Sequence, residues 1–385
     1  MILACLFIAA ASSAPAASDE EPQNPKFLEA RSVLEKDPDK AAELFEAAAK
    51  NEPELCAAWV NAGIIHERQK RPDKALADYR AGARASATCA DGFAAMASYE
   101  LRHGAPKTAE GYARDGLRAR PTHASLRNRL AEALIAQNRI KEAQDQALGV
   151  LKIDEKDSDA MLNLSRAYYA ERKFELARLA ANNAKEIAPN RGEIHHQIGV
   201  LFLQSNERPK ALIAFKRAAE LDPGLVGTQI NLAQLLTEAG DFEGALAAAK
   251  TAVAYAPKSA KAKLALANAY RGVQQLRDAE IAYQALLDQS PNDPDALYNL
   301  GILYLDAELE GMDMIERLQK AMKTFEAFLK LEQGTPEELQ TVSAFIVQAR
   351  RQIDAEKKRR ERDEKRKTRE ATKVPSSQPA KAGAK

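Results

Sequence analysis

Aromatic residues are scarce in this chain, at 6% of 385 residues, although hydrophobic residues make up 45%. The apolar content is therefore mostly alanine, leucine and isoleucine. Alanine and leucine lose little conformational entropy in a helix and are poor strand formers. The composition predicts a helical protein, and the length favours two or three units or an elongated array over one compact core.

Net charge is also small, at +1, which gives the chain as a whole no general attraction to nucleic acid or anionic lipid. Motifs that carry catalysis are missing as well: we find no nucleophile elbow, phosphate-binding loop, HExxH pair or zinc-type cysteine pairs. His195 and His196 are adjacent, so on a helix they point about 100° apart and cannot readily share one metal ion. The acidic stretch 154–159 lacks the central glycine and closing glutamate of a calcium loop. We expect no catalytic residues, no metal site and no cofactor.

Long hydrophobic runs are absent, and the one notable short run, Leu3–Ala11, has the length of a signal-peptide core. Ala14-Pro15-Ala16 then fits a small-x-small cleavage pattern, which predicts a signal peptide over residues 1–16 and a linker over 17–24. Alternatively, Ile2-Leu3-Ala4-Cys5 reads as a lipoprotein processing site, with Cys5 carrying a lipid. Both alternatives predict export, either to the periplasm or, through the lipid, to the outer membrane.

A period of 34 residues runs through most of the chain. Alanines recur at Ala41, Ala75, Ala109, Ala143, Ala177, Ala211, Ala245 and Ala279. Small residues precede the last seven of them by twelve positions, and prolines follow most of them by twelve. Apolar residues between these marks have helical spacing, so each unit is predicted to be two amphipathic helices joined by a short polar turn. The proline ends the second helix of each unit.

This pattern resembles the tetratricopeptide repeat, whose large, small, small, large and proline positions are occupied by Trp59, Ala62-Gly63, Ala75, Tyr79 and Pro291. The resemblance implies an all-α fold: a right-handed superhelical α-solenoid of about nine helix pairs over residues 25–332. In the ninth unit the small residue expected near 313 is replaced by Ala321, which predicts an insertion near 306–313. That insertion is either a specific contact or a neutral extension of the loop.

Three segments follow the repeats. Leu339, Val342, Ile346, Ala349 and Ile353 form an apolar stripe, which predicts a capping helix over 336–354. Residues 355–370 are dominated by charges in acid-first i, i+4 pairs, typical of a solvated helical extension. Contact with an anionic surface is the alternative for this extension. Residues 371–385 are predicted to be disordered.

The family resemblance also implies a concave groove lined by the first helix of each pair. The mixed apolar, amide and arginine character of this surface suits an extended peptide or a helix with apolar anchors, and not nucleic acid. The positions implied to face this groove are Val60, Asn61, Ile64, Asn128, Leu162, Asn163, Arg166, Tyr169, His196, Val200, Leu203, Ile230, Asn231, Leu264, Asn268, Arg271, Tyr298, Asn299 and Ile302. The recurring amides have two interpretations. Either they form a ladder that hydrogen-bonds the backbone of an extended ligand, or they are residues common at that position in the family.

Cys56 and Cys89 are 33 residues apart, so they fall near the same end of neighbouring helix pairs. In an oxidising compartment they form either a disulfide or two free buried thiols.

The segment from Gly301 through DEKRK (363–367) is similar to that of tetratricopeptide lipoproteins of the myxobacterial gliding-motility apparatus. This similarity implies a structural adaptor in the cell envelope. Our main hypothesis is a non-enzymatic scaffold that binds protein partners in its groove. The alternatives are an adaptor for secretion or outer-membrane assembly, and a regulatory subunit of a cell-wall synthesis enzyme.

Overall fold

The computed structural model describes residues 24–85 and 89–372, and all of the regular structure in these residues is α-helical. The helices are α1 Pro25–Val33, α2 Pro38–Asn51, α3 Cys56–Arg68, α4 Pro72–Ala85, α5 Ala90–Arg102, α6 Pro106–Ala119, α7 Ala124–Ala136, α8 Ile140–Leu151, α9 Ser158–Ala170, α10 Phe174–Ile187, α11 Gly192–Gln204, α12 Arg208–Leu221, α13 Val226–Glu238, α14 Phe242–Tyr255, α15 Ala260–Gly272, α16 Leu276–Gln289, α17 Pro294–Asp306, α18 Met314–Leu329 and α19 Pro336–Thr372. Helices α3, α5, α7 and the later first helices begin 34 residues apart, as the period predicts.

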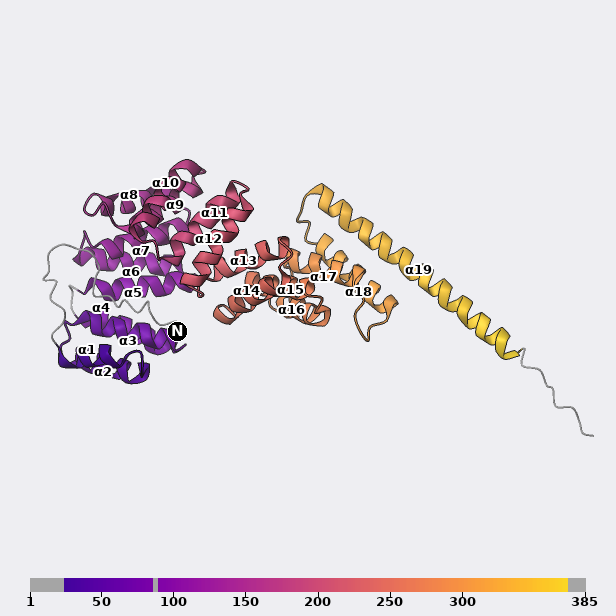
Figure 1. Ribbon diagram of the computed structural model, residues 1–385, viewed down its shortest axis with the longest axis horizontal. Coiled ribbons are helices and arrows are strands. Elements are labelled where there is room, and N and C mark those ends of the chain that lie inside the picture. Colours follow the sequence, from indigo (N-terminus) through magenta and orange to yellow (C-terminus); the bar gives the residue numbers. More distant parts are fainter. Residues whose placement is uncertain (1–23, 86–88, 373–385) are drawn as a thin grey trace, which may run out of the picture. The chain divides into compact units, whose positions relative to one another are not determined.

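The chain divides into two compact units, one ending at Leu221 and one beginning at Asp222. In the first unit, α1 to α12 form six helix pairs, and each helix packs against the next one along the chain (Figure 1). The first helices of successive pairs also touch, so that α3, α5, α7, α9 and α11 form one continuous layer. In the second unit α13, α15 and α17 do the same, and α19 packs against α18. This arrangement of stacked helix pairs confirms the predicted all-α solenoid.

The turn inside the second to eighth pairs is the same structure repeated. A residue with positive φ follows the first helix at positions 34 apart: Lys70, Gly104, Asn138, Arg172, Asn206, Gly240 and Gln274. The next residue donates its backbone N–H to a carbonyl five residues back in the helix, as Arg71 does to the carbonyl of His66 at 2.9 Å. This is the Schellman arrangement, which satisfies carbonyl groups left open at the helix end. The side chain is glycine at only two of these positions, so the turn is imposed by the packing of the two helices.

The recurring small residues lie where the two helices of a pair come closest. All eight periodic alanines are at most 1% exposed. A Cβ atom added to Gly63 would lie 2.4 Å from the Tyr79 ring, and one added to Gly301 would lie 2.4 Å from Phe325. The large aromatic residue of the second helix therefore fills the space left by glycine in the first.

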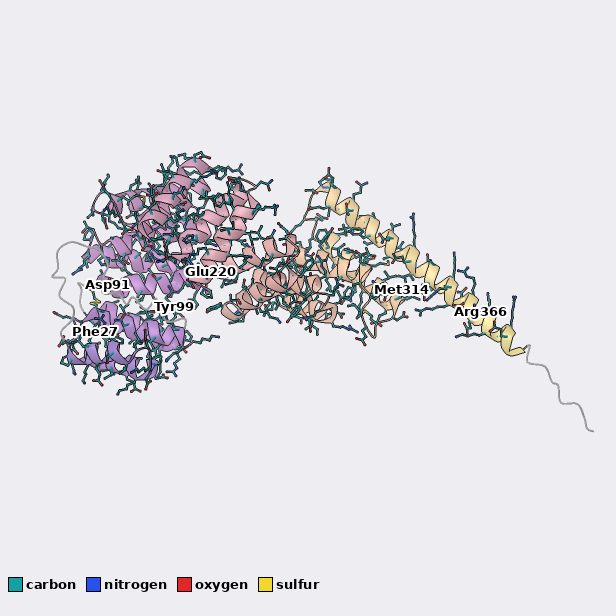
Figure 2. All side chains as sticks on the ribbon, in the orientation of Figure 1. Phe27, Asp91, Tyr99, Glu220, Met314 and Arg366 are labelled. Carbon is teal, nitrogen blue, oxygen red and sulfur yellow. A yellow bond between two sulfur atoms is a disulfide. The ribbon has the colours of Figure 1, made fainter. Side chains whose placement is uncertain are left out.

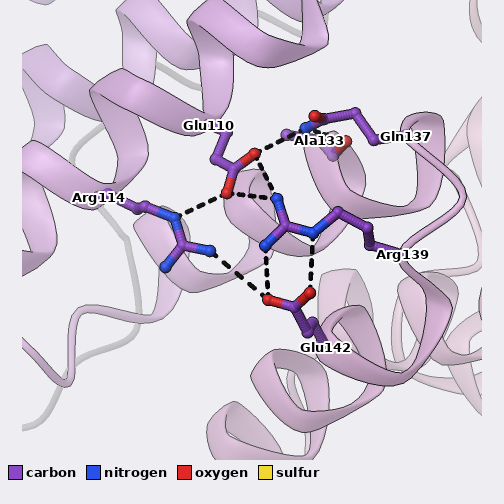
Figure 3. A network of polar contacts seen from close by, with 6 residues as sticks. All are labelled: Glu110, Arg114, Ala133, Gln137, Arg139 and Glu142. Atoms are coloured by element: carbon purple, nitrogen blue, oxygen red, sulfur yellow. Dashed lines mark hydrogen bonds and ion pairs between the residues drawn. The ribbon is translucent and has the colours of Figure 1, made fainter.

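Polar side chains connect neighbouring helix pairs near the turns. Glu110 on α6 accepts hydrogen bonds from Arg114 at 2.8 Å, Gln137 at 2.8 Å and Arg139 at 2.7 Å (Figure 3). Arg139 also donates to both carboxylate oxygens of Glu142 on α8, through Nε at 2.8 Å and Nη2 at 2.6 Å. Burial raises the pKa of Glu110, but the hydrogen bonds from Gln137, Arg114 and Arg139 outweigh it and lower the pKa to about 2.

The ninth pair departs from this pattern at the predicted insertion. Residues 307–313 join α17 to α18, and Gly311 supplies the positive φ in place of the regular turn position. Two arginines bind this loop: Arg277 donates to the carbonyl of Glu310 at 2.5 Å, and Arg360 binds Asp313. A third, Arg317 of α18, donates to the carbonyls of Tyr304 and Leu305 at the end of α17. The insertion is thus an anchored connection within the second unit.

Helix α19 is continuous from Pro336 to Thr372, so the predicted division into a cap ending at 354 and a separate extension falls inside one helix. Its apolar stripe packs against α18, with Val342 and Ala349 fully buried and Ile353 nearly so. Residues 371 and 372, expected to belong to a disordered tail, are the last of this helix. The i, i+4 ion pairs let the helix continue beyond its apolar stripe.

The expected signal peptide 1–16 with Cys5, nearly all of the expected linker, and the tail from 373 lie outside the described residues. No helix among residues 24–85 and 89–372 has both the length and the apolar character needed to cross a bilayer.

Candidate partner-binding groove

A cleft of about 470 Å³ opens in the first unit across the layer of first helices. Its residues come from α3, α4, α5, α7 and the start of α9. They are Val60, Ile64, Tyr79, Asp91, Ala94, Ala95, Ser98, Arg102, Ala124, Ser125, Asn128, Arg129, Lys156, Asp157, Ser158 and Asp159. Of the groove residues implied by the sequence, the structure brings Val60, Ile64 and Asn128 to this cleft.

The cleft exists because α5 presents small side chains to it. Ala94, Ala95 and Ser98 lie between the larger Val60 and Ile64 of α3 and the residues of α7. Our sequence reasoning did not assign α5 to the groove, because it lacks the large or amide residues that were sought there. The signal that could have found it is the run of small residues at positions where other repeats carry amides and aliphatic side chains.

The rim of the cleft is charged, with both signs represented. Arg102 binds Glu67 through two nitrogen atoms, at 3.0 and 2.8 Å, and Glu67 also accepts from the Tyr79 hydroxyl at 2.9 Å. On the other side, Asp91 lies 3.5 Å from His123. Burial lowers the pKa of His123, and Asp91 opposes that shift. The lining of the cleft thus combines apolar side chains with polar and charged ones of both signs.

A band of alternating charges continues from the cleft along α7, α9 and α11. Arg129 pairs with Glu132 at 3.0 Å and with Asp159 at 3.2 Å, and Arg166 pairs with Glu132 at 3.5 Å. Arg191 also pairs with Asp159. Burial raises the pKa of Asp159, but Arg129 and Arg191 outweigh it and hold the pKa below its usual range. Of this band, only Arg166 was predicted from the sequence to face the groove. The ion-pair partners lie about one repeat apart along the chain, so the sequence alone does not show that they meet.

The amides of the predicted ladder are used mainly within the protein. Asn128 is 1% exposed and donates to Asp157 at 3.0 Å, while Asn163 donates to the Asn128 carbonyl at 3.1 Å. These bonds join consecutive repeats, which favours the structural alternative for the ladder. However, the side-chain oxygen of Asn128 and the side-chain nitrogen of Asn61 are buried with no hydrogen-bond partner among residues 24–85 and 89–372. Such atoms carry a desolvation cost in the folded protein.

The other predicted groove residues of the first unit are half-buried or buried. Leu162 and Asn163 are 1% exposed, so they serve the packing between repeats. Tyr169 packs edge-on against Phe174, and His196 packs against Phe215. Burial, together with Arg166, lowers the pKa of His196 to about 4, so this imidazole is neutral at pH 7. Val60 and Asn61, at 4% and 3% exposure, are also nearly closed to solvent, whereas Val200 and Leu203 are half-buried.

In the second unit the predicted positions are half-buried and several amides already have partners. Asn268 accepts from the Tyr283 hydroxyl at 2.5 Å, and Asn299 donates to the Asp295 carbonyl at 2.8 Å. The ring of Tyr298 packs against Phe328. The remaining members, all half-buried, are Ile230, Asn231, Leu264, Arg271 and Ile302. Their role as partner contacts stays a prediction.

One cluster that could hold a metal ion lies among the described residues, where we expected no metal site from the sequence. Glu46, His66 and Asp78 come from α2, α3 and α4 and offer ligand atoms within 4.8 Å of one another. The two ring nitrogens of His66 face different carboxylates, with Nδ1 2.7 Å from Asp78 and Nε2 3.9 Å from Glu46. The 2.7 Å contact with Asp78 is a hydrogen bond, whereas 3.9 Å to Glu46 is too long for one. Burial raises the pKa of Asp78 to about 6, against the hydrogen bond from His66.

Cys56 and Cys89 are joined in the structure, with their Cα atoms 5.7 Å apart, at the start of α3 and just before α5 (Figure 2). Of the two alternatives for these cysteines, a disulfide and two free thiols, the structure shows the disulfide.

Stacked helix pairs with a cleft across their first helices define a helical-repeat interaction protein. Sequence profiles described as tetratricopeptide repeat match residues 35–88, 94–158, 129–192, 236–300 and 282–323. The chain belongs to the tetratricopeptide repeat family, as the 34-residue period predicted. Proteins of this family generally mediate protein–protein interactions and typically act as non-enzymatic scaffolds. No curated protein matches the sequence.

Among solved structures, the chain is similar to one in the APC/C hetero-tetramer Cut9–Hcn1, with a TM-score of 0.64 and 14% identity over 84% of this chain. It spans 62% of the length of that chain, and the likeness concerns the fold alone. It is also similar to a tetratricopeptide repeat protein from Parabacteroides merdae, with a TM-score of 0.48, 17% identity, and coverage of 63% of this chain and 96% of that one. PilF from Pseudomonas aeruginosa gives a TM-score of 0.45 and 17% identity over 55% of this chain and 96% of that one.

Proposed function

We propose that this protein is a non-enzymatic scaffold that binds an extended polypeptide segment of a partner in the cleft formed by α3, α5, α7 and α9. The observation that carries the proposal is the cleft itself, which is lined by the small residues Ala94, Ala95 and Ser98 of α5. An extended segment is a narrow ligand that fits across such small side chains.

The charges at the rim of the cleft fix the position at which the partner segment binds along it. Asp91 and Asp159 lie on the cleft together with Arg102, Arg129 and Lys156. A partner segment with charges of both signs around a small apolar anchor complements this surface, whereas a polyanion would meet the two aspartates. Rim charges of this kind select partners and speed association more than they add affinity.

Site-specific photocrosslinking in the native host tests the proposal. A photoreactive side chain at Ser98, inside the cleft, should give defined adducts with a partner protein. The same group at Ile213, 69% exposed on α12, is the matched control and should not give them. Ala95→Trp, which fills the cleft, should abolish the Ser98 adducts while leaving the helical circular dichroism unchanged. Adducts that persist in the Ala95→Trp variant would place the partner elsewhere.

We further propose that the scaffold works in the bacterial cell envelope, as a periplasmic protein or one attached to the outer membrane, and that it belongs to a gliding-motility machine. The apolar run Leu3–Ala11 and the similarity of residues 301–367 to motility lipoproteins support this. Mass spectrometry of the mature N-terminus distinguishes a chain starting near Ala17 from one carrying a lipid on Cys5. An unprocessed Met1 in the soluble cytoplasmic fraction would contradict the envelope proposal. The specific adduct found at Ser98 separates the motility role from the alternatives, a secretion or outer-membrane assembly component and a cell-wall synthase.

A further inference from the structure

The last part of α19 carries its positive charges on one side. Five basic residues, Lys358, Arg362, Lys365, Arg366 and Arg369, are spaced i, i+4, i+7, i+8 and i+11. At about 100° per residue they lie within an arc of about 100° on a continuous helix, over a length of about 17 Å. No acidic residue falls inside this arc. We call these five residues the basic face.

The basic face points away from the rest of the second unit. Val342, Ala349 and Ile353, which pack α19 against α18, lie on the opposite side of the helix, about 175° from the centre of the basic face. All five basic residues are exposed. Figure 1 shows the end of α19 continuing beyond α18, and Arg366 is labelled on this part in Figure 2. The face is therefore open to a partner along its whole length.

The charges of this face are only partly balanced within the helix. Arg366 lies 3.7 Å from Asp363 and 4.0 Å from Glu370, which are long ion pairs at the surface. Lys358, Arg362 and Lys365 form no ion pair with any residue that the structure describes. By contrast, Arg359 and Arg360, outside the arc, bind Glu356 at 2.7 and 2.8 Å. The helix thus neutralises its inner side and leaves its outer side positive.

We infer that the basic face docks on the flat surface of a membrane containing anionic phospholipids, and that this contact orients the second unit on the membrane. A plane touches only the basic face, so all five cations reach the headgroups together. A nucleic-acid groove surrounds a helix more widely, and would bring phosphates against Glu361 and Glu370, which flank the arc by about 40° on either side. The segment 358–369 has no aromatic residue for stacking on single strands. It has no apolar side either, so the contact is electrostatic, without insertion.

Vesicle co-sedimentation of the full chain tests this inference. Vesicles with about a third phosphatidylglycerol, an anionic lipid, should bind the protein, and binding should be lost at high salt because exposed charges are screened. Vesicles of phosphatidylcholine alone are the parallel arm, since a lipid anchor or an apolar N-terminal segment would bind both kinds. Wild-type protein that shows no preference for the anionic vesicles overturns the inference.

A matched pair of triple variants locates the contact. Lys358→Gln/Arg362→Gln/Lys365→Gln removes two lysines and one arginine from the basic face, and should lower the anionic-vesicle partition coefficient about a hundredfold, at about fivefold per charge. Lys357→Gln/Arg359→Gln/Lys367→Gln removes the same charges from the rest of the helix and should retain most of the binding. Glutamine is a good helix former, and circular dichroism checks that α19 persists. Equal losses in both variants, or tighter binding to duplex DNA than to anionic vesicles at the same salt, would overturn the inference.

Discussion

Arg360 and Asp313, 47 residues apart, form an ion pair of 2.5 Å that joins α19 to the loop before α18. The same aspartate caps α18, because its other oxygen accepts from the backbone N–H groups of Ile315 and Glu316 at 2.9 and 3.4 Å. The Asp313 carboxylate thus caps the N-terminus of α18 and also binds α19. These two contacts explain how the insertion at 307–313 remains ordered.

Substitutions at Asp313 should separate these two roles. Asp313→Asn keeps a capping oxygen but loses the charge, so amide hydrogen exchange should rise in residues 356–370 and change little at the start of α18. Asp313→Ala should raise exchange in both places. Arg360→Gln should reproduce the asparagine variant, and Arg366→Gln, whose ion pairs lie within α19, serves as the control. Unchanged exchange in all of these variants would show that the apolar stripe alone holds α19.

Glycine at position 63 is required by the approach of two helices. In Gly63→Ala the new methyl group would overlap the Tyr79 ring, which is 1% exposed and has little room to move. We expect a loss of about 1–3 kcal/mol in the free energy of unfolding, measured with denaturant. Gly111→Ala on α6 is the matched control, since nothing lies within 4 Å of its new methyl group, and it should gain about 0.5–1 kcal/mol. Similar results for the two variants would refute the close-contact explanation.

The His66–Asp78 pair should make stability depend on pH. Burial raises the folded-state pKa of Asp78 from 3.8 to about 6. A carboxyl group with a raised pKa stabilises the fold fully below its unfolded pKa, and that contribution is lost as the pH rises through about 6. The shift corresponds to at most about 3 kcal/mol. Denaturation series from pH 4 to pH 7 should therefore show a weaker fall, or a stronger rise, in unfolding free energy for Asp78→Asn than for wild type. Asp73→Asn, at an exposed position on the same helix, is the control and should show the same pH dependence as wild type. The same pH dependence in Asp78→Asn would show that the pKa of the Asp78 carboxyl group is not raised.

The Cys56–Cys89 bond should stabilise the first unit by restricting its unfolded chain. A disulfide that closes a loop of about this length contributes about 3–4 kcal/mol. Reductant should lower the free energy of unfolding of the wild type by that amount and leave the Cys56→Ala/Cys89→Ala variant unaffected. Alkylation of the non-reduced protein, read by intact mass, provides the direct check: two modified cysteines at these positions would disprove the bond.

Much of the architecture could be predicted from residues that recur every 34 positions along the chain. The eight periodic alanines and the prolines predicted the helix pairs, and the shift from 313 to Ala321 predicted the longer loop of the ninth pair but not the contacts that anchor it. The turns were predicted less completely, since Lys70, Arg172 and Gln274 adopt positive φ although glycine is the residue that usually indicates this conformation. The end of the cap was placed at 354 because the apolar stripe stops there, whereas ion pairs carry α19 to Thr372.

The site was predicted less well than the fold, for a geometric reason. A position on a first helix can face the groove or the next repeat, and helical spacing alone does not decide which. Leu162 and Asn163 proved to be buried between repeats, whereas Ala95 and Ser98 of α5, small and unremarkable in sequence, line the cleft.

The sequence by itself therefore determined the helix pairs and their 34-residue register, because close helix contact requires small residues at fixed intervals. Only the tertiary structure decided which side chains meet, as Glu46, His66 and Asp78 do, or Arg129 and Asp159. Those partners lie on different helices, and the distances between their charged groups are set by how the pairs stack.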